Sequence, residues 1–78
     1  MTPARKEPNM ETYSGRFAAR LKELRLKAKL TPEEVAESVG VSTRTVYSWE
    51  SARSFPNVEL LPKISETLGL KAVAKLFP

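Results

Sequence analysis

The sequence contains no cysteine and no histidine. Disulfides, thiolate metal sites, histidine acid–base chemistry and cysteine–histidine or serine–histidine nucleophile pairs are therefore excluded. The 78 residues leave room for one domain, which must be stabilised by the packing of a single small core. Beyond isolated carboxylates and hydroxyls no catalytic constellation remains, so we expect no enzyme, no metal and no cofactor.

Long hydrophobic runs are also absent. No apolar stretch approaches the roughly 20 residues that span a bilayer, and the N-terminal sequence lacks the apolar centre of a signal peptide. The absence of cysteine suits a reducing compartment. We therefore expect a cytoplasmic protein that has no membrane partner.

The basic residues are unevenly distributed along the chain. The net charge is +4, and the segment up to residue 30 carries eight basic residues against three acidic ones, whereas the remainder is close to neutral. A basic flank of this kind suits a surface that binds phosphates. Simple solvation of one helix face explains it equally well.

Residues 1–13 are predicted to form a flexible arm before a domain at residues 14–78. The arm contains two prolines and few apolar residues. Its Arg5 and Lys6 are of the kind that enters a DNA minor groove, although a free tail also accounts for them.

A first helix is expected at about residues 15–29, with Ser14 as its cap. Its apolar residues recur at spacings of four, three and four, which gives one buried face made of Phe17, Leu21, Leu24 and Ala28.

Two short helices joined by a tight turn are predicted within residues 30–50. Thr31 can cap a helix that opens with Pro32, since proline loses nothing at the first helical position. Gly40 suits the left-handed conformation that ends a helix, and Ser42 can cap the next helix. A connection of about three residues forces a steep crossing, which is the geometry of a DNA-reading helix-turn-helix.

The helices of this motif are expected to bury one face each. The residues assigned to those buried faces are Val35, Ala36, Val39, Val46 and Trp49. The opposite face of the second helix of the pair is polar and rich in hydrogen-bond donors, and it carries Thr43, Arg44, Tyr47 and Ser48. A role in the core does not explain that face.

A further helix is expected at about residues 58–68, between an Asn57 cap and Gly69. Residues 71–78 then form a short amphipathic turn or helix. Its apolar residues, Val73, Leu76 and Phe77, are our candidates for a homodimer surface around a two-fold axis. Sealing the core of the monomer is the equally weighted alternative for all three.

Several residues at characteristic spacings point to one family: Thr31-Pro-Glu-Glu-Val35-Ala36, Gly40-Val41-Ser42, Val46, Trp49-Glu50, Pro56 and Leu68-Gly69. On these residues the chain, from about residue 16 to 77, resembles the repressor and Cro class (XRE type) of helix-turn-helix proteins, which includes the lambdoid phage repressors. The resemblance implies an all-α, compact five-helix domain like that of lambda repressor, whose third helix lies in the major groove of double-stranded DNA.

The resemblance also implies roles for individual residues. Base contacts fall to Thr43, Arg44, Tyr47 and Ser48, and phosphate contacts to Arg20, Lys22, Arg25, Ser42, Ser51 and Arg53. Arg44 is the sharpest candidate, because a guanidinium can bond guanine through two hydrogen bonds; plain solvation is the alternative for Tyr47 and Ser48. Structural roles fall to Arg25, Glu50, Ala36, Gly40, Val46 and Trp49, with Arg25 paired to Glu50.

The chain departs from the family pattern at two places. Pro32 stands where the family usually has a glutamine, so one common DNA contact is expected to be missing. Ser51 and Ala52 stand where the family usually has Asn-Gly, and alanine tolerates a left-handed turn poorly, which leaves the loop geometry near Arg53 open.

The function implied is sequence-specific binding of double-stranded DNA by a transcriptional regulator, with a repressor and a homodimer as the first expectation. The alternative is a protein-interaction module of the same fold, such as an antitoxin-type or polymerase-binding partner. Pro32 and the three acidic residues Glu33, Glu34 and Glu37 favour that alternative slightly. No small-molecule ligand is indicated.

Overall fold

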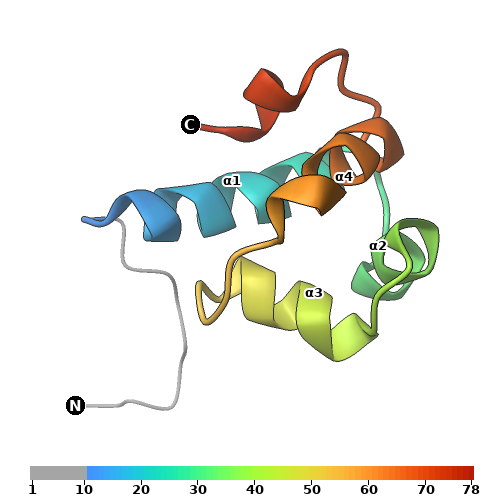
Figure 1. The fold of residues 1–78 in the computed structure, drawn as a ribbon, viewed down its shortest axis with the longest axis horizontal. Helices are drawn as coiled ribbons and strands as arrows, with labels where there is room; N and C mark the ends of the chain where they lie inside the picture. Colours follow the sequence, from blue (N-terminus) through green and yellow to red (C-terminus); the bar gives the residue numbers. More distant parts are fainter. Residues whose placement is uncertain (1–10) are drawn as a thin grey trace.

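The computed structural model describes residues 11–78, which are all-α as predicted. Their elements are α1 (Tyr13–Lys27), α2 (Pro32–Val39), α3 (Thr43–Glu50), the 3-10 turn η1 (Val58–Leu60), α4 (Leu61–Thr67) and the 3-10 turn η2 (Val73–Leu76). Figure 1 shows α1 running across the molecule with α3 below it and η2 above it. The described part thus has four α-helices, and a single 3-10 turn replaces the fifth helix that the resemblance implied.

The first helix begins earlier than expected. Thr12, and not Ser14, is its cap, since the Thr12 hydroxyl oxygen accepts a hydrogen bond from the Gly15 N–H at 3.0 Å. Both residues can cap a helix, and the earlier one is used here, which places Tyr13 in the first turn. The predicted arm at residues 1–13 therefore overlaps α1, and its Arg5 and Lys6 lie outside the described residues.

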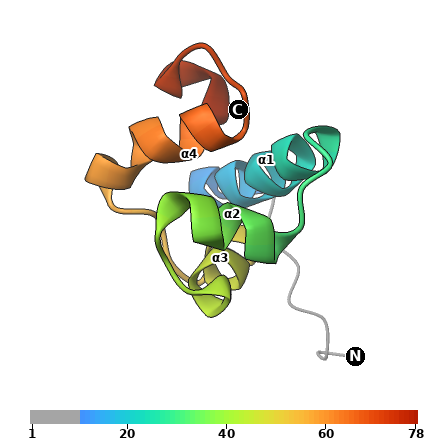
Figure 2. The same cartoon turned by 90° about the vertical axis from the view of Figure 1, so that its right-hand side faces the viewer.

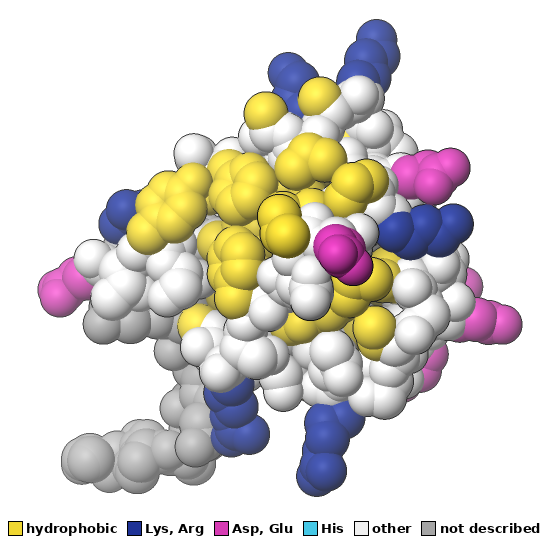
Figure 3. All heavy atoms as spheres, viewed as in Figure 1, with side chains coloured by type: hydrophobic (Ala, Val, Ile, Leu, Met, Phe, Trp, Pro, Cys, Tyr) yellow, Lys and Arg dark blue, Asp and Glu magenta, His cyan; other side chains and the backbone are white. Residues whose placement is uncertain are grey.

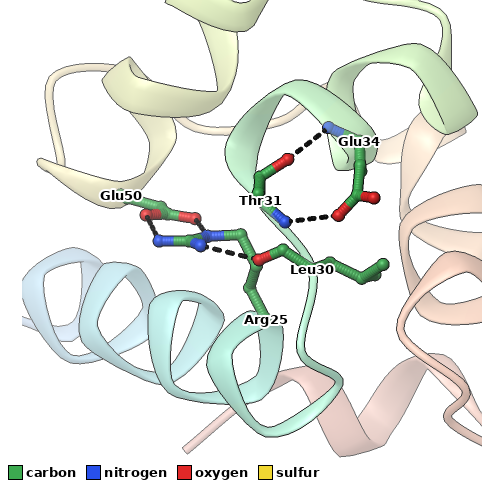
Figure 4. Close-up of polar contacts among 5 residues, drawn as sticks. All are labelled: Arg25, Leu30, Thr31, Glu34 and Glu50. Carbon is green, nitrogen blue, oxygen red and sulfur yellow. Dashed lines mark hydrogen bonds and ion pairs between the residues drawn. The ribbon is translucent and has the colours of Figure 1, made fainter.

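The second helix begins and ends as predicted. Thr31 and Glu34 form a capping box: the Thr31 hydroxyl accepts from the Glu34 N–H at 3.1 Å, and the Thr31 N–H donates to the Glu34 carboxylate at 2.8 Å (Figure 4). Gly40 ends the helix at φ +90, in the left-handed region that glycine adopts without a steric penalty.

The third helix follows after a short turn. The Ser42 hydroxyl accepts from the Thr45 N–H at 3.2 Å, so Ser42 is the cap that the sequence predicts. Figure 2 shows α2 lying between α3 and α4, and α2 packs against both. The predicted helix-turn-helix is therefore present.

The fourth helix is shorter than expected because its first turn is a 3-10 turn. The Asn57 side chain caps that turn by accepting from the Glu59 N–H at 2.9 Å. Pro62 lies in the first turn of α4, where its missing N–H is tolerated, and Gly69 ends the helix at φ +76.

The core draws on every helix and on η2. Its buried apolar residues include Phe17, Leu21 and Leu24 of α1, Val35, Ala36 and Val39 of α2, Val46 and Trp49 of α3, Leu61 and Ile64 of α4, and Leu76 of η2. The segment that follows Gly69 is therefore part of the same folded unit as the helix-turn-helix. Among the helices of residues 11–78, none combines the length and the apolar character that crossing a membrane requires.

Candidate nucleic-acid interface

The outer face of α3 carries a shallow, open groove. Its lining residues are Thr43, Arg44, Tyr47, Ser48, Ser51 and Arg53. The opposite face of α3 is anchored in the core, because Val46 is fully buried and Trp49 is 3% exposed. The structure thus brings all four predicted base-contacting residues together on one surface, with Arg53 beside them.

Arg44 offers the strongest hydrogen-bonding group of this groove. Its side chain is exposed and has no ion pair with any residue in the described part of the chain. Tyr47 is also exposed, at 53%, whereas Thr43 and Ser48 are half-buried. The groove therefore combines a free guanidinium with hydroxyl groups, which suits the base edges of DNA.

The two serines expected to contact phosphate are already engaged. The Ser51 hydroxyl donates to the Ser48 carbonyl at 3.3 Å. The Ser42 hydroxyl accepts from the Thr45 N–H and lies 2.9 Å from the Thr45 hydroxyl. A phosphate oxygen needs a donor, so Ser51 would first have to release the Ser48 carbonyl, whereas the Ser42 hydroxyl can still donate when the Thr45 hydroxyl is the donor of their contact.

The orientation of α3 is fixed by a buried ion pair. The Arg25 Nε donates to Glu50 Oε2 at 2.6 Å and its Nη2 donates to Glu50 Oε1 at 3.1 Å, while Nη1 donates to the Leu30 carbonyl at 2.9 Å (Figure 4). The pairing that the resemblance implied is present. Arg25 is only 7% exposed and each of its guanidinium nitrogens donates within the protein, so its contact with phosphate stays a prediction.

Arg20, also expected to contact phosphate, already has partners within the chain. Its Nη2 donates to the Lys75 carbonyl at 3.2 Å, and its Nη1 lies 3.8 Å from the Glu23 carboxylate. Arg20 therefore holds η2 on the side of α1 away from α3. Lys22 precedes Arg25 by three positions and so shares the flank of α1 that faces α3, and its side chain is exposed.

The loop after α3 adopts the left-handed turn despite its alanine. Ala52 has φ +63, its N–H donates to the Trp49 carbonyl at 3.3 Å, and the Arg53 N–H donates to the Ser48 carbonyl at 2.9 Å. These two bonds form a Schellman ending of the helix. The alanine is strained there, yet Arg53 is exposed at the edge of the groove.

The three candidate dimer residues are placed differently from one another. Leu76 is fully buried in the core of the monomer and presents no surface to a second copy, whereas Val73 and Phe77 are partly buried against that core. The exposed apolar side chains near the C-terminal segment are instead Tyr13 and Phe55. Sequence reasoning missed Phe55 because it lies in a turn, where no helical periodicity indicates which side chains are buried.

Comparison with known proteins identifies the family. Residues 21–74 match the model of a helix-turn-helix family. The chain is 40% identical over 50 residues to the HTH-type transcriptional activator BcrR of Enterococcus faecalis, a match that covers 64% of this chain and 24% of BcrR. It is 30% identical over 54 residues to the phage CTXphi transcriptional repressor RstR of Vibrio cholerae, covering 69% of this chain and 49% of RstR.

A solved structure supports the same conclusion. The restriction-modification controller protein C.AhdI of Aeromonas hydrophila superposes with a TM-score of 0.74 at 26% identity, covering 80% of this chain and 92% of that one. The chain therefore belongs to the helix-turn-helix family of the repressor and Cro class. It spans about a quarter of the length of BcrR and about half that of RstR.

Proposed function

We propose that the chain is a sequence-specific DNA-binding regulator of transcription that inserts α3 into the major groove. The observation that carries the proposal is the groove on the outer face of α3, whose exposed Arg44 has no ion pair in the described chain. The major groove of B-DNA is about 12 Å wide and admits an α-helix. The membership of the family and the regulator names of BcrR and RstR support this function.

The residues of the groove take separate roles in this proposal. Arg44 bonds guanine through O6 and N7, and Thr43 contacts a thymine methyl group or donates its hydroxyl to a base. Tyr47 and Ser48 contact the neighbouring bases. Phosphates are held by Lys22 and Arg53, the exposed cations on either side of α3.

The regulator acts as a homodimer on two half-sites about one helical turn apart. A single α3 of 8 residues reads only a few base pairs, and two-fold symmetry doubles both the contacts and the site. Repression is the simpler regulatory outcome, since a bound dimer that blocks a promoter needs no surface beyond its DNA interface.

Selection of bound duplexes from a random pool tests this function directly. A two-fold symmetric consensus with half-sites about 10 base pairs apart is the expected result. Affinity for the selected duplex falls steeply as the salt concentration rises, because each neutralised phosphate releases a counterion. No duplex binding at low salt would overturn the proposal.

A protein-interaction module is the second candidate, because the exposed face of α2 carries Glu33, Glu34 and Glu37. This surface is acidic beside a basic flank of α1, and it suits a basic protein surface rather than a phosphate backbone. The same binding measurements separate the two functions, since a module of this kind retains no affinity for duplexes of any sequence.

A further inference from the structure

An exposed apolar patch lies on the face of the molecule shown in Figure 3, next to the end of α3. Its aromatic members, Tyr13, Phe55 and Phe77, are linked through ring contacts, and the exposed Val58 follows Phe55 by three residues. The Phe55 and Phe77 rings pack on Phe17, with centroids 4.6 Å and 5.2 Å away, and Tyr13 stacks on Phe77 at 6.4 Å. Phe55 is nevertheless 48% exposed and Val58 71% exposed.

The monomer leaves about half of Tyr13 and Phe55 and 71% of Val58 exposed. Val58 belongs to η1, whose three residues include none that is buried. Apolar side chains that stay exposed to water forgo the favourable free energy of burial. They gain it when another surface covers them. The patch is therefore a candidate binding surface for another protein surface.

Two opposite charges flank the patch at equal intervals along the chain. Arg53 precedes Pro56 by three residues and Glu59 follows it by three, and Pro56 itself is buried. Both charged side chains are exposed, and neither forms an ion pair within the described residues. A two-fold axis near Pro56 brings Arg53 of each copy opposite Glu59 of the other, which is the self-complementarity that an isologous interface requires.

The geometry points to residues 53–59 as the homodimer interface, with a second copy of this chain as the occupant. Phe55 and Val58 of the two copies pack together, and two Arg53–Glu59 pairs set their alignment. This placement excludes Leu76, which is inaccessible, and keeps Phe77, which lies in the same patch. A guanidinium has five donors, so Arg53 can bond Glu59 of the second copy and still reach a phosphate.

The position of the segment agrees with the DNA spacing, and this step rests on the proposed function. Half-sites one turn apart are about 34 Å from centre to centre, so each α3 must lie about 17 Å from the two-fold axis. The 8 residues of α3 are about 12 Å long, and residues 53–59 begin three residues after its last residue. The chain between the centre of α3 and the segment is therefore long enough to span the required distance.

Sedimentation equilibrium of the purified chain without DNA tests the interface. The wild-type chain forms a reversible dimer, and Val58→Gln weakens its dimerisation constant roughly tenfold or more, as is typical of a central interface residue. Leu26→Gln is the matched control, since Leu26 is 57% exposed at the opposite end of α1 from Tyr13. A wild-type chain that stays monomeric, or an equal effect of both substitutions, overturns the inference.

A charge exchange tests the alignment separately. Arg53→Glu and Glu59→Lys each weaken the dimer, and the double variant R53E/E59K regains most of the lost affinity because the pairs re-form with reversed polarity. Thermal unfolding of each variant confirms that the fold is intact. A double variant no better than the single ones overturns the pairing.

The two proposals fail in different ways. If the chain dimerises through residues 53–59 but binds no duplex, only the DNA-binding function is wrong. If wild-type and Val58→Gln chains bind a selected half-site duplex equally and neither dimerises, the interface and the homodimer are wrong, while sequence-specific DNA binding stands.

Discussion

The guanidinium of Arg25 and the carboxylate of Glu50 form two parallel hydrogen bonds inside the protein. Arg25 belongs to α1, and Glu50 is the last residue of α3. The third bond of Arg25, to the carbonyl of Leu30, reaches the residue before the cap of α2. One side chain therefore fixes the relative positions of three helices, including the one that we propose reads DNA.

Breaking the Arg25–Glu50 pair is expected to lower the stability of the fold strongly. Glu50→Gln should lower the free energy of unfolding by about 3–5 kcal/mol, because it leaves the buried Arg25 charge uncompensated. Urea denaturation measures the loss. Glu37→Gln, at an exposed position of α2, should change stability by less than about 0.5 kcal/mol. Comparable effects of the two substitutions would contradict the structural role of the pair.

Each of the four α-helices within residues 11–78 is followed by a residue in the left-handed conformation, and two of these residues are not glycine. The four are Lys29 at φ +61, Gly40 at φ +90, Ala52 at φ +63 and Gly69 at φ +76. Ala52→Gly and Lys29→Gly should each stabilise the chain by about 0.5–1 kcal/mol, since glycine removes the steric penalty.

Gly69→Ala tests the same steric penalty in the opposite direction, by adding a Cβ at a left-handed position. It should destabilise the chain by about 1 kcal/mol, through the backbone alone, because an added Cβ meets nothing within 4 Å. Thermal unfolding compares the three variants. If Ala52→Gly lowers the melting temperature, the strain assigned to Ala52 is absent.

Leu76 is expected to affect folding rather than association. It is fully buried in the core, so Leu76→Ala should cost about 2–5 kcal/mol of stability by leaving a cavity. The nearby exposed Lys71 supplies the control, Lys71→Ala, which should be close to neutral. A Leu76→Ala chain that keeps wild-type stability but loses only its self-association would restore the C-terminal segment as a dimer surface.

Arg44 and Lys22 should differ in the kind of DNA affinity that they contribute. Arg44→Ala should cost about 1–3 kcal/mol on the selected duplex and relax the preference at one base pair. Lys22→Ala should weaken binding to selected and unrelated duplexes by the same factor, because a phosphate contact carries no sequence information. Competition binding against single-base variants of the selected duplex distinguishes the two patterns.

Local signals in the sequence predicted the helix-turn-helix correctly. Gly40 and Ser42 determine its turn through backbone conformation and capping, which depend only on neighbouring residues. The predicted start of α1 was two residues too late, because Thr12 and Ser14 are both able to cap a helix. The C-terminal segment was predicted as a turn or helix, and a 3-10 turn of four residues without a side-chain cap is what forms.

Tertiary burial was harder to predict at the phosphate-contacting positions. The resemblance predicted the pair of Arg25 with Glu50, but nothing near Arg20 in the sequence shows that it donates to the Lys75 carbonyl, which is 55 residues away. The same holds for Phe55, whose ring meets Phe17 from a loop. Arg44 and Tyr47 were easier, because the burial of Val46 and Trp49 on the same short helix requires them to face outward.

The capping box at the start of α2 limits how many phosphates the protein can neutralise. Pro32 has no N–H and the N–H of Glu34 is bonded to the Thr31 hydroxyl, which leaves the N–H of Glu33 in a first turn that carries two carboxylates. This helix start therefore repels an anion instead of binding one.

Lys22 and Arg53 then remain as the cations assigned to phosphates, which gives four for a dimer. The logarithm of the binding constant should fall with the logarithm of salt concentration at a slope of about −3.6. A slope near −7 would show that the dimer displaces about twice as many counterions from DNA as these cations can account for.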